Sequence, residues 1–280
     1  MSEIRFAYAG TPQGQVHYAE CGSGAPVVLL HQTPRSWDEY REVLPLLGRA
    51  RRAIAPDTPG FGASARIAEH TIENYARGLL HLLDALGLDE FDLVGHHTGG
   101  VVAVELAARA PDRVRRLVLS STPYIDAAAR ERRAARERRA ARPPIDAVGE
   151  RPDGAHLTEL WARRAAFYPE GRPDLLTRFV RDALRVWPDV EHGHAAVSAY
   201  RMEERIGLIG CPVLCVGASA DPYAFPELGP LTERIPHAGT AVIEGGAVPL
   251  EFQAGQFADL VAAFLDGAGV SLTQEMEPRE

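Results

Sequence analysis

Short apolar runs of β type alternate with helical patterns along most of this chain, which leaves few folds open to it. The apolar runs occupy residues 16–19, 26–30, 52–55, 91–94, 114–119, 212–216 and 241–243. Helical patterns occupy residues 37–47, 71–86, 99–110 and 252–265. Because parallel strands need crossover connections, this order predicts an α/β fold with a mostly parallel central sheet flanked by helices.

The alternation stops between residues 123 and 205, where a helical pattern interrupted by prolines contains no run of β type. An insertion at the carboxyl end of a parallel strand lies over the crevice where such sheets bind ligands. We therefore expect residues 1–122 and 206–268 to form an α/β core, residues 123–205 to form a helical cap, and residues 269–280 to form a C-terminal tail.

Charge and composition exclude several classes of partner. The formal net charge of −8 argues against a general nucleic-acid binder, and no apolar run is long enough to span a membrane. Cys21, Cys211 and Cys215 lack the spacing of a metal site and are interpreted as buried free thiols in a reducing cytoplasm. We expect a cytoplasmic protein with a small-molecule substrate, no cofactor, no metal, and no nucleic-acid or membrane partner. The sequence leaves the oligomeric state open, and a homodimer is compatible with it.

The segment DLVGHHTGG, residues 92–100, has the form of a strand, a sharp turn and the start of a helix. In G-x-S-x-G enzymes the middle residue of this turn is a nucleophilic serine. Here the middle position is His97. The turn therefore predicts a reactive site with an imidazole where an alcohol is usual.

Four segments in order carry a resemblance to a known family: VVLLHQTPRSWDEY, IAPDTPGFGAS, GHHTGG and CPVLCVGASADP. They resemble the loop after the third strand, the following turn, the nucleophile elbow and the acid loop of the α/β-hydrolase fold superfamily. The resemblance covers nearly all of residues 16–265. It implies the branch with a helical cap between strands six and seven, and it implies that Asp221 is the triad acid.

The same comparison reveals departures from the family pattern. His97 occupies the nucleophile position, and Ala247 in EGGAVPLEF occupies the position expected for the triad histidine. Gln32 replaces the glycine of the family's H-G pair. With only Asp221 retained, the Ser-His-Asp mechanism does not transfer to this chain.

The two replacements suggest one rearrangement. An imidazole on His97 is long enough to enter the space left by Ala247, so that one nitrogen meets Asp221 while the other faces the pocket. Such a His97–Asp221 pair suits general acid–base catalysis. The resemblance implies an oxyanion hole formed by the backbone N–H groups of Thr33 and Thr98, which stabilises an enolate or alkoxide whatever the side chains.

Further residues are candidates for the substrate pocket, with His31 expected as its wall and Gln32 as either an extra polar donor or a loop-packing residue. His96 is expected to point away into packing, and Thr98 is not expected to be a nucleophile. His192 and His194 do not converge on one metal ion at helical spacing. The predicted pocket residues are His31, Gln32, Trp37, Tyr124, Trp161, Trp187, Ala247 and Val248.

Three functions compete for this sequence. The first is an enzyme without a serine nucleophile, which uses His97 as general base for C–C cleavage, cyclisation, elimination or direct water activation on an apolar or aromatic small molecule. The second is a catalytically silent homologue that binds a small molecule or acts as an accessory protein. The third is an ordinary esterase with its histidine recruited from elsewhere. A polar residue of catalytic type at position 97 favours the first.

Overall fold

A mixed sheet forms the centre of the computed structural model, which describes residues 3–139, 144–236 and 238–267. Its eight strands in that part of the chain follow the order β1-β2-β4-β3-β5-β6-β7-β8. The first two pairings, β1 with β2 and β2 with β4, are antiparallel, and all others are parallel. The strands are β1 Arg5–Thr11, β2 Gly14–Cys21, β3 Pro26–Leu30, β4 Arg52–Pro56, β5 Phe91–His96, β6 Val114–Ser120, β7 Val213–Ala218 and β8 Gly239–Ile243. The predicted fold class is confirmed.

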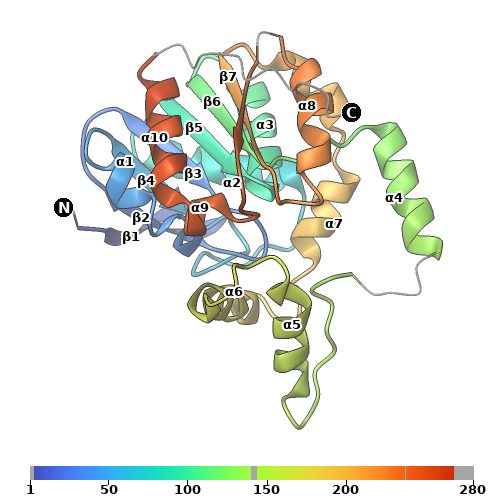
Figure 1. The fold of residues 1–280 in the computed structure, drawn as a ribbon. Helices are drawn as coiled ribbons and strands as arrows, with labels where there is room; N and C mark the ends of the chain where they lie inside the picture. The colour runs from blue at the N-terminus through green and yellow to red at the C-terminus, as the bar shows by residue number, and fades with distance from the viewer. Residues whose placement is uncertain (1–2, 140–143, 237, 268–280) are drawn as a thin grey trace.

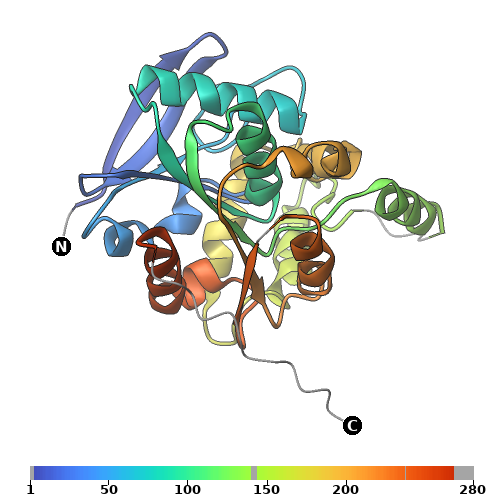
Figure 2. The same cartoon turned by 90° about the horizontal axis from the view of Figure 1, so that it is seen from above.

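Helices cover both faces of the sheet, as Figures 1 and 2 show. One face carries α2 (Ile72–Ala85), α3 (Thr98–Arg109) and α8 (Leu228–Glu233), whose apolar side chains form one core. The other face carries α1 (Leu44–Leu47), α9 (Pro249–Phe252) and α10 (Ala254–Leu265), with a second core. Because both faces are covered, β5 is buried along its whole length and its sequence is a continuous run rather than an alternation.

Between β6 and β7 the described chain is helical, as the sequence predicts. The insertion contains α4 (Ala127–Arg139), α5 (Ala155–Ala165), α6 (Pro173–Arg185) and α7 (His192–Ala199), followed by the 3-10 turns Met202–Glu204 and Ile206–Leu208. Figure 1 shows α5 and α6 below one end of the sheet, whereas α4 stands to the side. The apolar face of α6 is buried through Leu175, Leu176, Phe179 and Ala183, which places this helix against the rest of the molecule.

The structure differs from the predicted elements in three places. Strand β1 is not among the predicted elements: it is an edge strand whose residues are all exposed or half-exposed, so that no apolar run marks it. The helix predicted over residues 37–47 is a 3-10 turn, Trp37–Tyr40, followed by α1, which has Pro45 in its first turn. The helix predicted over residues 252–265 divides at Gln253 into α9 and α10. The predicted tail lies outside the described residues.

No helix in the described ranges is long and apolar enough to cross a bilayer.

Candidate active site

The turn between β5 and α3 is strained and tightly packed. His97 has φ 46° and ψ −114°, a backbone conformation that side-chain-bearing residues rarely adopt and that is common at functional sites. A Cβ on Gly95 would lie 2.4 Å from the Gly99 carbonyl oxygen, and one on Gly99 would lie 2.0 Å from the Leu30 carbonyl oxygen. Both positions therefore need glycine for the helix to approach the strands this closely.

His97 and Asp221, which are separated by 124 residues of sequence, meet at this turn. Nε2 of His97 lies 2.8 Å from Oδ2 of Asp221. The imidazole remains 23% exposed, whereas the carboxylate is 3% exposed. No group in the described part of the chain hydrogen-bonds Nδ1 of His97, so this nitrogen is free to meet a ligand.

Asp221 is held as a carboxylate by its surroundings. Its Oδ1 accepts hydrogen bonds from the backbone N–H groups of Tyr223 and Ala224, at 2.9 and 3.0 Å. Burial alone would raise the pKa of Asp221, but the contact with His97 and the two N–H groups outweigh burial and lower this pKa to about 2. A group with this pKa is ionised at neutral pH and stabilises a positive charge on the His97 ring.

Thr33 and Thr98, the predicted oxyanion-hole residues, lie side by side next to this pair. Their hydroxyl oxygens are 3.0 Å apart, and both residues are buried. Thr98 is the first residue of α3, so its N–H has no acceptor within the helix and lies at the positive end of the helix dipole. The N–H of His97 is not available, because it donates to the Ser120 carbonyl at 3.0 Å.

His96 is fully buried and lies edge-to-face against the His97 ring, with 4.6 Å between ring centroids. Its Nδ1 lies 3.1 Å from the Ser120 hydroxyl. Burial, reinforced by the neighbouring His97, holds the pKa of His96 well below the ordinary histidine value. A neutral imidazole in this position packs against His97 without competing for Asp221.

His31 and Gln32 have structural partners. His31, predicted as pocket wall, is 1% exposed, and both of its ring nitrogens are bonded. Its Nε2 accepts the Thr58 N–H at 3.0 Å and its Nδ1 donates to the Gln32 carbonyl at 2.7 Å. The Gln32 side chain donates to Glu39 at 2.5 Å, which favours the loop-packing alternative over a donor in the oxyanion hole.

Trp37, another predicted pocket residue, has its ring contacts on the side of β1. Its ring packs edge-on to Phe6 of β1, with 4.8 Å between centroids, and the Arg41 guanidinium lies 5.6 Å from it. In the sheet, β1 is separated from β5 by three strands, so this aromatic pair lies away from the elbow.

The remaining predicted pocket residues occupy varied positions. Tyr124 is 4% exposed, and the guanidinium carbon of Arg234 lies 5.8 Å from the centroid of the tyrosine ring. Trp161 lies on α5 and is half-buried. Trp187 follows α6, and the centroid of its ring lies 5.5 Å from that of His156. Ala247 is half-buried and Val248 is buried, both on the segment between β8 and α9.

One group of metal-ligand type occurs in the described part of the cap: Asp146, Glu191 and His194. Asp146 is fully buried and both of its carboxylate oxygens accept hydrogen bonds from Arg164. His194 Nδ1 lies 3.0 Å from Glu191. Since the arginine already compensates the buried carboxylate, the geometry is that of an ion network that holds α5 and α7 together.

Comparisons with known proteins agree with this architecture. The model of the alpha/beta hydrolase fold family matches residues 25–250. A 2-hydroxy-6-oxo-2,4-heptadienoate hydrolase of Pseudomonas putida is 42% identical over 120 residues, which are 41% of this chain and 43% of that protein. A soluble epoxide hydrolase of Corynebacterium sp. is 39% identical over 106 residues, 38% of this chain and 37% of that protein. Each match therefore spans less than half of the relative.

Solved structures show the same fold over nearly the whole chain. A bromoperoxidase from Bacillus anthracis aligns with a TM-score of 0.77 and 21% identity, and the alignment covers 94% of this chain and 100% of that one. At this identity the likeness shows the fold alone. Because the family model spans the elbow, the cap and the acid loop, this chain belongs to the alpha/beta hydrolase fold family.

Proposed function

We propose that this protein is an enzyme in which His97 acts as general base, oriented by Asp221, on a small apolar or aromatic carbonyl compound. The observation that carries the proposal is the 2.8 Å contact between His97 Nε2 and Asp221 Oδ2. With Nε2 next to the carboxylate, Nδ1 is the nitrogen that accepts a proton from the substrate or from water. A base within hydrogen-bond reach of its proton typically contributes on the order of 10²–10⁴ in rate.

The proposed step is the removal of a proton next to a carbonyl group. The proton moves to Nδ1 of His97, and the negative charge moves onto the carbonyl oxygen. The N–H groups of Thr98 and Thr33 stabilise that oxygen, and Asp221 stabilises the imidazolium. From the enolate, elimination of a leaving group and cyclisation are accessible. For C–C cleavage the same base would instead take the proton of a hydroxyl group β to the carbonyl, and the enolate would form as the C–C bond breaks; the base can also activate a water molecule directly.

The relatives suggest which carbonyl compounds to try first. The name of the Pseudomonas putida relative contains a 2-hydroxy-6-oxo-dienoate, a compound whose carbonyl groups stand next to acidic C–H bonds. This class fits the proposed base and anion hole, so it forms the first panel. No serine alcohol is required for the proton-removal step.

Solvent deuterium uptake tests the proton-removal step. The protein is incubated in D₂O with 2-hydroxy-6-oxo-2,4-heptadienoate and simple aryl ketones, and mass spectrometry follows deuterium at carbon. We expect uptake above the buffer rate with the wild-type protein and the buffer rate with His97→Ala. Ligand binding without any uptake or turnover across the panel would favour the alternative, a catalytically silent homologue that binds a small molecule.

Fluorophosphonate labelling tests the esterase alternative. These reagents react with activated serines, and an activated serine needs an adjacent base. With His97 at the elbow we expect no covalent adduct at any serine or threonine, measured by intact-mass spectrometry against a serine hydrolase as positive control. Stoichiometric labelling of one hydroxyl would contradict the proposal and revive an acyl-enzyme mechanism.

A further inference from the structure

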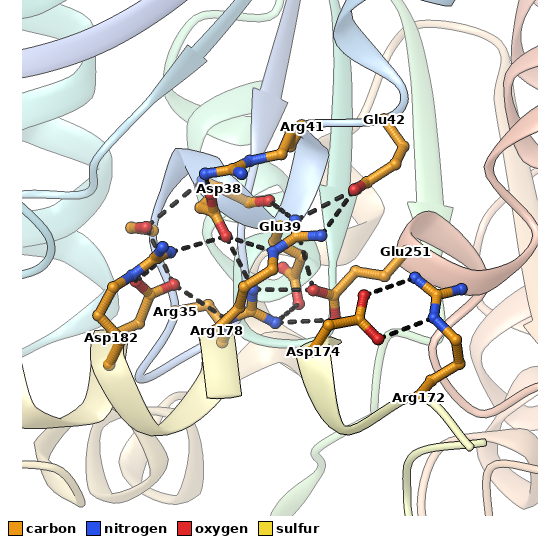
Figure 3. Close-up of polar contacts among 12 residues, drawn as sticks. Arg35, Asp38, Glu39, Arg41, Glu42, Arg172, Asp174, Arg178, Asp182 and Glu251 are labelled. Carbon is orange, nitrogen blue, oxygen red and sulfur yellow. Dashed lines mark hydrogen bonds and ion pairs between the residues drawn. The ribbon is translucent and has the colours of Figure 1, made fainter. Parts of the chain in front are cut away.

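A group of buried charges joins the Thr33 loop to the cap and to α9 (Figure 3). At its centre is Arg35, which is 0% exposed. All other members are buried acids except Arg178, a buried arginine of α6. We call this group the Arg35 cluster: Arg35, Asp38, Glu39, Arg178, Asp182 and Glu251.

Arg35 uses every nitrogen of its guanidinium for a contact with another element. Nη1 and Nη2 donate to the two carboxylate oxygens of Glu251 on α9, at 2.8 and 2.9 Å. Nε donates to Asp182 on α6 at 3.1 Å, and Nη1 also reaches the Tyr168 hydroxyl of the cap at 3.3 Å. One side chain of the core loop therefore holds two segments that are 147 and 216 residues away.

The cap meets the same loop through further contacts. The Ser36 hydroxyl donates to Asp182 at 3.0 Å, and Nε of Arg178 donates to Asp38 at 2.6 Å. Helix α7 packs on Thr33 itself, because a Cβ on Gly193 would lie 2.2 Å from Thr33 Cγ2. Two cap helices thus rest on a segment of four residues, Thr33 to Ser36.

The location of Arg35 distinguishes it from a charge that serves stability alone. It follows Thr33 by two residues, and its partner Glu251 follows Ala247 and Val248 by a few residues on the segment after β8. Separation of Arg35 from Asp182 would leave Glu251 as the hydrogen-bonded carboxylate of Arg35 and would remove the hydrogen bond that joins this loop residue to α6, a loss that is costly for a buried charge. A shift of α6 would therefore displace the loop that carries Thr33.

We infer that Arg35 is a positioning residue that couples the seating of cap helix α6 to the placement of the Thr33 N–H. The inference rests on the proposed function in one respect, namely that Thr33 is an anion-hole donor. When α6 is seated, Asp182 and Glu251 fix the guanidinium and the loop conformation. When α6 moves away, the loop loses two of its attachments and the anion hole is incomplete.

Amide hydrogen exchange tests this coupling on the ligand-free protein, with Asp182→Asn compared with Asp146→Asn. Both residues are carboxylates of the cap, 1% and 0% exposed, that pair with an arginine: Asp182 with Arg35, which is buried, and Asp146 with Arg164, whose side chain is 12% exposed. They differ in partner, because Asp146 contacts only cap residues, whereas Asp182 contacts Arg35 and Ser36. We expect Asp182→Asn to speed exchange at Gln32 and Arg35 about tenfold or more, since a hydrogen bond to a buried charge is lost.

The control variant should speed exchange in α5 and α7 and leave Gln32 and Arg35 at wild-type rates; because α7 packs on Thr33, the Thr33 amide is compared between the two variants. We expect the ¹H–¹⁵N resonance of the Thr33 amide to shift more in Asp182→Asn than in Asp146→Asn, as the accompanying spectroscopic signature. Faster exchange confined to α6 in Asp182→Asn, or equal acceleration of the loop in both variants, would overturn the coupling. If Asp182→Asn does not fold, Ser36→Ala takes its place, because it removes one hydrogen bond between the loop and the cap. The same result is then expected, namely faster exchange at Gln32 and Arg35 than in Asp146→Asn. Because no substrate is present, an inactive His97 leaves this test unaffected.

Discussion

His97→Ala is expected to lower kcat by about 10²–10⁴ on any substrate that the wild-type protein converts. The variant keeps the elbow backbone and the anion hole but removes the base that lies 2.8 Å from Asp221. KM is expected to change little, because the ring acts mainly in the transition state. Steady-state kinetics on the first substrate of the carbonyl panel that turns over provides the measurement.

Two further variants test whether the loss of turnover is specific to the base at position 97. Asp221→Asn should impair turnover less than loss of the ring, since it disturbs the orientation and tautomer of the base but leaves the base in place. His192→Ala removes a half-exposed histidine of the cap that lies 4.6 Å from His70, and it should retain wild-type kcat. If His97→Ala turned over like wild type, proton transfer by His97 would be ruled out as the source of catalysis.

The alternation of strands and helices was sufficient to predict the central sheet, because each buried strand is a continuous apolar run between helical patterns. The strand that escaped prediction, β1, has no fully buried residue; its ladder with β2 and the partly buried Ala7 and Ala9 hold it in place. The beginning of a helix depends on single residues: Thr71 accepts the Asn74 N–H and begins α2, as its sequence indicates. The interruptions at residues 41–43 and at Gln253 are not visible in the periodicity.

The contact between His97 and Asp221 could be predicted, because the long side chain of His97 at the elbow was expected to enter the space that the short side chain of Ala247 leaves. Trp37 and His31 could not be placed in the same way. Their partners Phe6, Arg41 and Thr58 are set by the tertiary structure, and an aromatic or polar residue near a motif has no sequence signal that says which way it points.

The Arg35 cluster was missed for a related reason. Arginine and carboxylate residues are usually exposed, and the partners of Arg35 lie in distant parts of the chain. The sequence contains two weak signals of this buried pair. Arg35 stands between Pro34 and Ser-Trp, and Glu251 stands inside the apolar segment VPLEF. A charge within an apolar segment is a reason to look for a buried partner.

Arg35→Met is expected to destabilise the protein by about 3–5 kcal/mol, the typical result of removing one partner from a buried ion pair. Methionine fills much of the volume of the arginine but removes both hydrogen bonds to Glu251 and one of those to Asp182, which keeps Arg181 and Ser36. Chemical denaturation followed by tryptophan fluorescence measures the difference. Arg172→Met is the control, because Arg172, the residue before α6, pairs with Asp174 (Figure 3) and these side chains are 39% and 60% exposed, so that loss of the pair should leave the midpoint near that of wild type.

The loss should also depend on pH in a defined direction. Burial raises the pKa of Glu251 above its ordinary value of 4.5 even beside Arg35, and removal of the arginine raises it further. A carboxyl group whose pKa is higher in the folded state contributes stability below its unfolded pKa and loses it as the pH rises through the folded value. The deficit of Arg35→Met relative to wild type should therefore shrink as the pH falls toward 4.5. A deficit independent of pH, or equal to that of Arg172→Met, would mean that the buried carboxylates do not depend on Arg35 and that the guanidinium does not hold the Thr33 loop to the cap.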